Sequence, residues 1–228
     1  MSKYKELFGD WAEVLDGFLK SSEFKKIGKE LKEMDGEVFP DFSDMFNAFR
    51  LCPYSKVITV MLTSNPFSED NMTGLALNYS YSGKGDDSSP SKLREAIFNA
   101  VKEDCQEGAS NGPRKIDLKN WAKQGVLLLN CNLSGGINGK KPHFAMWKSF
   151  IEYLLRHLAH HRGGIVYCLI GRIAMEYREC IDETCNDVIL IEHPMSAITR
   201  NQKWDHRSMF HYLDKVLPML HSTKIKWL

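Results

Sequence analysis

The chain has 228 residues, and 30 Lys and Arg balance 29 Asp and Glu, so its formal net charge is +1. This length suits one sizeable domain and is short for two, so we predict a single domain over residues 1–228. The near-zero charge excludes a strong overall attraction to nucleic acid but leaves room for a local basic face. No apolar run approaches the roughly 20 residues of a membrane span, and the charged N-terminus is unlike a signal peptide, so we expect a cytoplasmic monomer without membrane contact.

The predicted elements begin with helical apolar spacing over residues 4–20 and 22–34, with Ser21 or Ser22 as the N-cap of the second helix. Four short apolar runs then follow that are typical of strands buried in a parallel sheet: residues 57–62, 125–130, 164–171 and 187–194. Helical patterns lie near residues 90–104, 145–160, 172–180 and 206–220. This alternation predicts a three-layer α/β/α fold around a central four-stranded parallel sheet.

The cysteines and histidines do not indicate a metal site. The six cysteines lie at positions 52, 105, 131, 168, 180 and 185 and form no CxxC pair, so we expect buried free thiols. The His-rich stretch over residues 157–162 lies at a predicted helix end and lacks a zinc-binding pattern. We therefore expect neither a metal nor an organic cofactor.

Distinctive residues follow each predicted strand. These groups are Thr63-Ser64-Asn65-Pro66, Asn130-Cys131-Asn132, Gly171-Arg172 and His193-Pro194. Ligands of open α/β sheets bind outside the carboxyl ends of the strands. A single Asn or His at a strand end is usually structural, but four such groups at one sheet edge indicate one site.

Several motifs carry a family resemblance. The stretches DMFNAFRLCPYSKVITVML (44–62), WAKQGVLLLNCNLS (121–134) and MWKSFIEYLL (146–155), the His-Pro pair at 193–194 and the final IKWL are similar to motifs of the first uracil-DNA glycosylase family. The resemblance covers nearly the whole chain. It implies a four-stranded parallel sheet between helices, DNA as the partner, and hydrolysis of the N-glycosidic bond of a flipped base to leave an abasic site.

The resemblance assigns the chemistry to three positions. His193 matches the neutral His that donates a hydrogen bond to the base oxygen where negative charge develops. Asn130 matches the base-reading Asn, whose amide fits the edge of uracil or, when turned, that of cytosine. Asn65 stands where the motif G-Q-D-P-Y-H-G has its catalytic Asp; it cannot act as a base but can hold a water, as in the related mismatch-specific branch. Glu69 or Asp70 is the alternative source of a carboxylate.

The base pocket departs from the family. We expect Ser64, Phe67 and Leu77 to line it together with Asn130. Phe67 replaces the Tyr that crowds the C5 edge of the base, and Leu77 replaces the Phe that stacks on uracil. Loss of a stacking ring costs about 1–3 kcal/mol and opens space. These departures favour a pyrimidine substituted at C5 over plain uracil.

Two segments that are predicted to contact the DNA backbone precede the last strand. Ser89, Pro90 and Ser91 resemble the family's proline-rich loop that pinches the DNA backbone. Gly171 stands where the family's Gly-Ser loop contacts a phosphate. Arg172 replaces the Ser of that loop and is able to pair with a phosphate as a charged donor.

The last predicted DNA contacts follow His193. There the family inserts a leucine wedge into the duplex, and Ile198 or Met195 is the corresponding residue. Arg200 and Lys203 are candidate phosphate contacts.

Three functions remain open at this stage. The first is a glycosylase for a modified base, such as hydroxymethylated or glucosylated cytosine in viral DNA, with a role in defence. The second is uracil excision in DNA repair with an altered motif. The third is an inactive DNA-binding accessory protein, against which the retention of both Asn130 and His193 argues.

Overall fold

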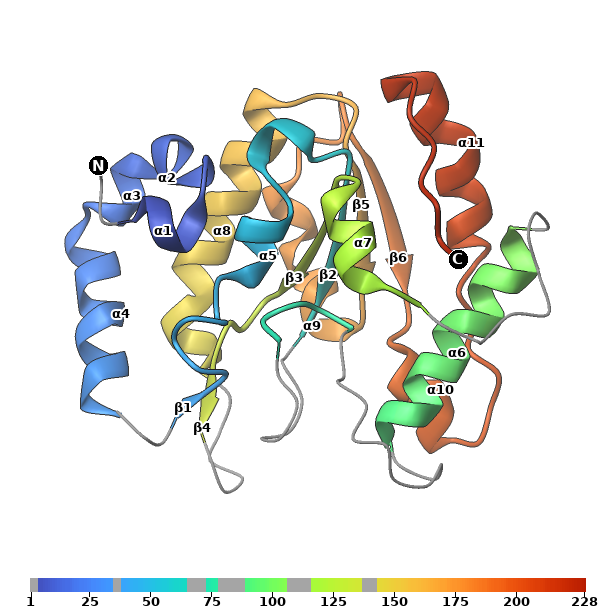
Figure 1. Cartoon of the computed structure of the whole chain (residues 1–228), viewed down its shortest axis with the longest axis horizontal. Coiled ribbons are helices and arrows are strands. Elements are labelled where there is room, and N and C mark those ends of the chain that lie inside the picture. Colours follow the sequence, from blue (N-terminus) through green and yellow to red (C-terminus); the bar gives the residue numbers. More distant parts are fainter. Residues whose placement is uncertain (1–3, 35–37, 65–72, 78–88, 106–115, 137–142) are drawn as a thin grey trace.

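The structure is a computed structural model of the 228-residue chain, and it describes residues 4–34, 38–64, 73–77, 89–105, 116–136 and 143–228. Helices lie on both sides of a central sheet (Figure 1). Among the residues described, no helix has both the length and the apolar character needed to span a bilayer.

The central sheet has four parallel strands in the order β3-β2-β5-β6. These are β2 (Thr59–Thr63), β3 (Val126–Asn130), β5 (Val166–Ile170) and β6 (Asp187–Ile191). Every residue of the first three is buried, whereas β6 is an edge strand that begins exposed. The predicted α/β/α architecture is therefore confirmed, because continuous apolar runs specify strands covered on both faces.

The longer helices cover the two faces of this sheet. On one side α4 (Ser22–Glu33) packs against α8 (Phe144–His161), and on the other α6 (Ser89–Asp104) packs against α11 (Met209–His221), as Figure 1 shows. The shorter helical elements are α5 (Asn47–Leu51), η1 (Tyr54–Lys56), α7 (Leu118–Lys123), α9 (Arg172–Met175), η2 (Glu176–Cys180) and α10 (Pro194–Thr199).

The predicted helix over residues 4–20 is wrong. Three short helices replace it: α1 (Lys5–Phe8), α2 (Trp11–Val14) and α3 (Asp16–Leu19). The first break falls at Gly9, whose φ of 59° and ψ of −133° form a backbone conformation that suits glycine and cannot continue a helix. The next helix, α4, begins as predicted, because the Ser21 side chain accepts a hydrogen bond from the Phe24 amide at 3.1 Å.

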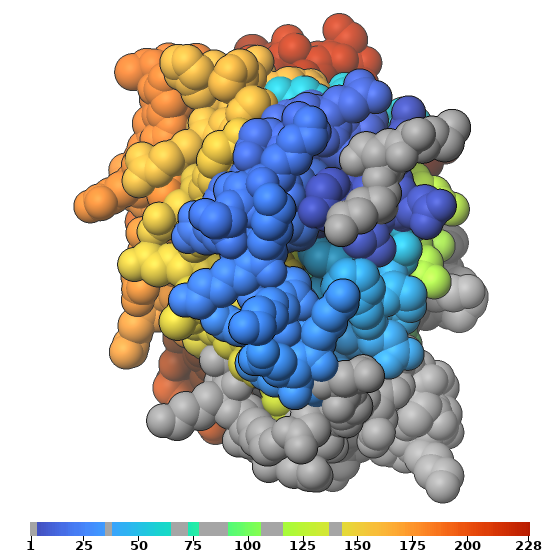
Figure 2. Space-filling model, turned by 90° about the vertical axis from the view of Figure 1, so that its left-hand side faces the viewer, coloured from blue at the N-terminus to red at the C-terminus, as the bar shows by residue number. Residues whose placement is uncertain are grey.

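Aromatic rings fix the N-terminal helices to the rest of the fold. The Phe8 and Phe46 ring centroids are 4.5 Å apart, and the cluster continues to Phe49 and to Phe150 on α8. Figure 2 shows the N-terminal helices spread over this flank beside α8. Each buried ring stabilises the fold by about 1.5–3 kcal/mol.

A small second sheet holds the segment that follows β3. There β1 (Val38–Phe39) pairs antiparallel with β4 (Gly135–Gly136). The hydroxyl of the buried Ser134 accepts a hydrogen bond from Trp147 Nε1 at 2.7 Å and lies 2.9 Å from His143 Nδ1. These contacts tie the chain after Asn130 to the start of α8.

Candidate active site

The carboxyl ends of the four strands lie at one edge of the sheet because all four strands are parallel. The register pairs Thr63 with Asn130 at the ends of β2 and β3. It also pairs Ile170 with Ile191, so the residues that come directly after β5 and β6 lie close together. Of the predicted site residues, Asn65 and Phe67 lie outside the described residues, as do the alternative carboxylates Glu69 and Asp70.

Asn130 is held by a neighbour on the adjacent strand. The Thr63 hydroxyl donates a hydrogen bond to Oδ1 of Asn130 at 2.6 Å. Thr63 is 1% exposed and Asn130 is 3% exposed. Pairing continues beyond the strands, because the Cys131 amide donates to the Thr63 carbonyl at 2.7 Å. The Asn130 amide is thus a buried group at the site edge whose oxygen is already engaged.

His193 is fixed as the N-cap of α10. Its Nδ1 accepts a hydrogen bond from the Met195 amide at 3.2 Å, so the neutral ring carries its proton on Nε2. Burial lowers the pKa of His193 to about 4, which keeps the ring neutral near pH 7. A neutral His with its proton on Nε2 suits a hydrogen-bond donor to developing negative charge rather than a general base.

Gly171 lies directly against His193. A Cβ placed on Gly171 would come 3.1 Å from the Cβ of His193, and the backbone there has a φ of 94°. The Gly171 amide also donates to the Ile191 carbonyl at 2.7 Å. Only a residue without a side chain fits this close approach comfortably. The geometry therefore gives Gly171 a role in positioning His193, in addition to its predicted role as a phosphate contact.

Leu77 occupies a strained position beside β3. Its φ is 59° and it is 8% exposed. Just before it, the Ala76 amide donates to the Leu128 carbonyl at 3.1 Å, which fixes this segment along the strand. A left-handed backbone costs a residue with a side chain about 1–2 kcal/mol, so the surrounding packing must hold Leu77 in place.

Ser64 and Asn132 extend the edge beyond Thr63 and Asn130. The half-buried Ser64 accepts a hydrogen bond from the Asn132 amide at 3.1 Å through its carbonyl. Asn132 is 1% exposed, and neither polar atom of its side chain has a hydrogen-bond partner among the described residues. The sequence marked Asn132 only as part of a strand-end group; its burial became visible only in the fold.

The predicted DNA-binding residues at 89–91 differ in form from the expectation. Ser89, Pro90 and Ser91 form the first turn of α6 and are not a loop. The reason is that Pro is favourable in the first turn of a helix, where its missing N–H is not needed. Arg172 begins α9, is exposed, and has no ion-pair partner within the described part of the chain.

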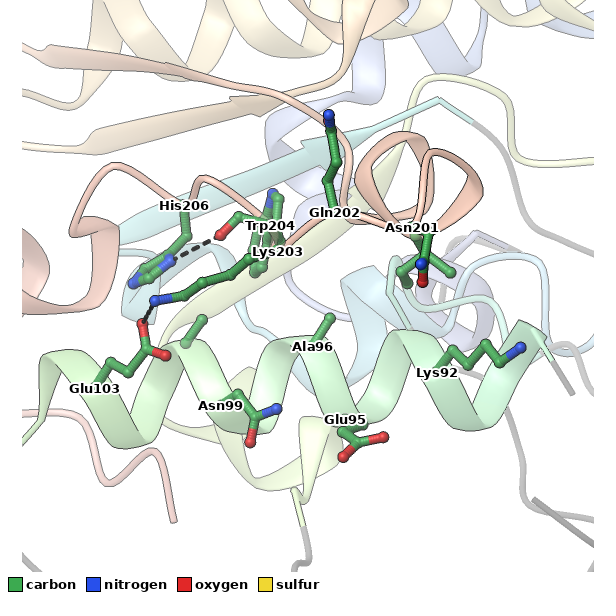
Figure 3. A pocket seen from close by; sticks show the side chains of 12 residues that line it. Lys92, Glu95, Ala96, Asn99, Glu103, Asn201, Gln202, Lys203, Trp204 and His206 are labelled. Carbon is green, nitrogen blue, oxygen red and sulfur yellow. Dashed lines mark hydrogen bonds and ion pairs between the residues drawn. The ribbon is translucent and has the colours of Figure 1, made fainter. Parts of the chain in front are cut away.

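A groove of about 470 Å³ lies between α6 and the chain from the end of α10 onward (Figure 3). Ile198 and Lys203, two of the predicted DNA contacts, line it. Lys203 forms an ion pair with Glu103 of α6 at 2.8 Å, one of the dashed contacts in Figure 3. A phosphate at Lys203 would have to compete with this carboxylate.

The remaining predicted contacts near His193 are also engaged. Arg200 holds Glu192 through two hydrogen bonds of 2.7 Å each, and both side chains are on the surface. Met195 and Ile198, the two wedge candidates, are half-buried against the core. The wedge assignment stays a prediction.

Together the fold and the site define an open-sheet α/β protein with a buried amide and a neutral histidine at the carboxyl edge of the sheet. The chain belongs to the uracil DNA glycosylase superfamily, whose family model matches residues 49–221. It is accordingly a DNA glycosylase, a hydrolase that acts on N-glycosyl bonds.

Curated relatives agree with this assignment. A uracil-DNA glycosylase of Campylobacter hominis is 34% identical over 188 residues, which span 81% of this chain and 77% of that protein. A uracil-DNA glycosylase of Lactobacillus helveticus is 33% identical over 197 residues, or 83% of this chain and 80% of that protein.

Among solved structures, mimivirus uracil-DNA glycosylase matches with a TM-score of 0.81 over 97% of this chain and 87% of that one. The identity is 16%, so this likeness confirms the fold alone.

Proposed function

We propose that the protein removes a C5-substituted pyrimidine from DNA. The expected substrate is hydroxymethylated or glucosylated cytosine of viral DNA, and the expected role is defence against such DNA. The observation that carries this proposal is Leu77. It replaces the Phe that stacks on uracil in the uracil-DNA glycosylase family that the sequence resembles. Its buried, left-handed position is held by packing, so the smaller side chain cannot simply swing out. Weaker stacking penalises a plain flat base, and the missing ring leaves room for a substituent.

The retained residues supply the chemistry in this proposal. As the C1′–N bond breaks, electrons move onto the base and the sugar becomes positively charged. His193 donates from Nε2 to the base oxygen that gains negative charge. Asn130 reads the edge of the base, and Asn65 positions the water that attacks the sugar. The water oxygen becomes the hydroxyl on C1′, and the proton that the water loses neutralises the released base anion. The carboxylate that would stabilise the sugar in the family is absent from position 65, so the enzyme depends more on stabilising the leaving base.

The test is a base-release assay on synthetic duplexes. Each duplex carries one uracil, cytosine, 5-hydroxymethylcytosine, 5-hydroxymethyluracil or glucosylated 5-hydroxymethylcytosine, and abasic sites are detected by strand cleavage in alkali. We expect release of the modified cytosines and loss of that release in His193→Ala. Release of uracil alone would refute the modified-base proposal.

Ordinary uracil excision is the second candidate. The relatives of 33–34% identity are named uracil-DNA glycosylases, and this observation favours it. If this candidate is right, the same assay shows release of uracil and no release of modified cytosines. The release of uracil is again lost in His193→Ala. The two candidates therefore separate within one experiment.

A further inference from the structure

We propose that Thr63 is a specificity-determining residue that locks the Asn130 amide in one orientation, so that the site accepts the edge of a cytosine-type base and rejects that of a uracil-type base. This inference rests on the proposed function, which supplies both Asn130 as the base reader and a cytosine-type base as the accepted substrate. The motif G-Q-D-P-Y-H-G, which residues 63–68 resemble, begins with Gly at the position of Thr63. The Thr63 hydroxyl is therefore a feature of this chain that the motif does not contain.

The sheet register places the two side chains together. Thr63 and Asn130 are paired residues of the parallel strands β2 and β3, so their side chains project from the same face. The Thr63 hydroxyl donates to Asn130 Oδ1 at 2.6 Å, and water has almost no access to either residue. A hydroxyl has one hydrogen to donate, and among the described residues Asn130 is its recorded acceptor.

This hydrogen bond separates the two possible orientations of the amide. If the amide turned by half a turn, Nδ2 would donate to the Thr63 oxygen instead, and the hydroxyl hydrogen would lose the acceptor that it has in the structure. A buried donor without an acceptor is costly, so the orientation with Oδ1 at Thr63 is favoured. In that orientation Nδ2 points away from Thr63. With Gly at position 63, the hydroxyl that distinguishes the two orientations would be missing.

The orientation decides which base edge fits. Cytosine offers an acceptor at N3 and a donor at its N4 amino group, whereas uracil offers a donor at N3 and an acceptor at O4. The two edges are reversed, so an amide with its oxygen and nitrogen fixed complements one and opposes the other. Sites built to hydrogen-bond a substrate reject mismatched analogues strongly, because both partners are left unpaired. Thr63 acts through Asn130 and is a positioning residue.

The experiment compares 5-hydroxymethylcytosine with 5-hydroxymethyluracil in identical duplexes, because these bases carry the same substituent and differ at the edge. The readout is the ratio of the two single-turnover release rates, which loss of folded enzyme does not change. We expect the wild-type protein to prefer the cytosine by at least about 100-fold. Thr63→Val, which keeps the shape without the hydroxyl, should lower this ratio at least about tenfold. Thr63→Ser, which restores the hydroxyl, should keep the ratio within about threefold of wild type.

The outcomes separate the inference from the proposed function. A Thr63→Val protein with the wild-type ratio, or a wild-type protein without preference, would overturn the role of Thr63. If the wild-type protein releases uracil alone, the modified-base proposal fails, and the same variants are then compared on uracil against cytosine. If Thr63→Val changes the ratio of uracil to cytosine release and Thr63→Ser restores it, Thr63 orients Asn130. The selection for cytosine would then be refuted. An unchanged ratio would overturn the inference.

Discussion

Gly171 and His193 pack against each other at the ends of β5 and β6, with 3.1 Å between the Cβ of His193 and the place where a Cβ on Gly171 would lie. The imidazole is held from the other side by the Met195 amide. His193 is thus clamped between a bare backbone and a helix N-terminus, and its position depends on Gly171 having no side chain.

Replacement of this glycine should disturb both stability and activity. In Gly171→Ala the methyl group must tolerate a φ of 94° and also displaces His193. We expect a loss of about 1–2 kcal/mol in the free energy of unfolding, measured in urea, and a base-release rate at least about tenfold lower.

Gly28→Ala is the matched control for this variant. Gly28 lies inside α4, and an added Cβ there meets no atom within 4 Å. The free energy of unfolding of Gly28→Ala should rise by about 0.5–1 kcal/mol, and its base-release rate should stay unchanged. Equal activity in Gly171→Ala and Gly28→Ala would contradict the positioning of His193 by Gly171.

The neutral state of His193 makes a prediction about pH. Burial lowers its pKa to about 4, whereas the unfolded chain has a His pKa of about 6.5. The unfolded state therefore binds this proton first as the pH falls. The stability that His193 contributes by staying neutral is fully present above pH ~6.5 and is lost progressively down to about pH 4. A difference of about 2.5 pKa units corresponds to about 3 kcal/mol.

Urea unfolding between pH 4 and 7 measures this contribution. The wild-type protein should lose more stability over that range than His193→Gln, which cannot titrate. Base release should show no acid limb from His193 near pH 6.5, because the neutral donor persists in the fold. Identical pH dependence of stability in the two proteins would show that His193 titrates normally.

Much of the fold and part of the site could be predicted from local sequence. Continuous apolar runs indicated β2, β3, β5 and β6, and the His-Pro pair after the last strand marked His193. The bond between Thr63 and Asn130 could not be predicted, because it joins residues 67 positions apart and depends on strand register. The break at Gly9 was missed because apolar spacing continues across it while the backbone leaves the helical conformation.

Charge pairing separates the arginines predicted to contact DNA. Arg200 is held by Glu192 through two hydrogen bonds, whereas exposed Arg172 has no ion-pair partner within the described ranges. Arg172→Ala should weaken DNA binding and reduce the slope of log affinity against log salt by about 1. Arg200→Ala should change the slope less, because its charge is already compensated. Fluorescence anisotropy with labelled duplex over a salt series measures both, and equal slopes in the two variants would refute the distinction.

Asn132 is a buried amide whose side-chain nitrogen and oxygen lack hydrogen-bond partners among the described residues. Asn132→Leu has the same branching of heavy atoms and removes both unpaired polar atoms. We expect the free energy of unfolding to rise by about 1–3 kcal/mol, measured in urea. A stabilised protein that has lost base release would place Asn132 among the residues that contact DNA or the base. A destabilised one would show that the amide has a partner in solution.

Leu77 offers a direct test of how the pocket chooses its base. Leu77→Phe restores the ring that the resembling family stacks on uracil, at a position already buried beside β3. A stacking gain of about 1–3 kcal/mol corresponds to a rise of roughly 5–150-fold in the rate of uracil release relative to 5-hydroxymethylcytosine. Leu77→Met keeps the side-chain volume nearly constant and adds no flat ring, so it serves as the control for the loss of Leu77 itself. If both variants change the ratio equally, the loss of Leu77 rather than stacking controls the choice. An unchanged ratio in Leu77→Phe would remove Leu77 from the base pocket.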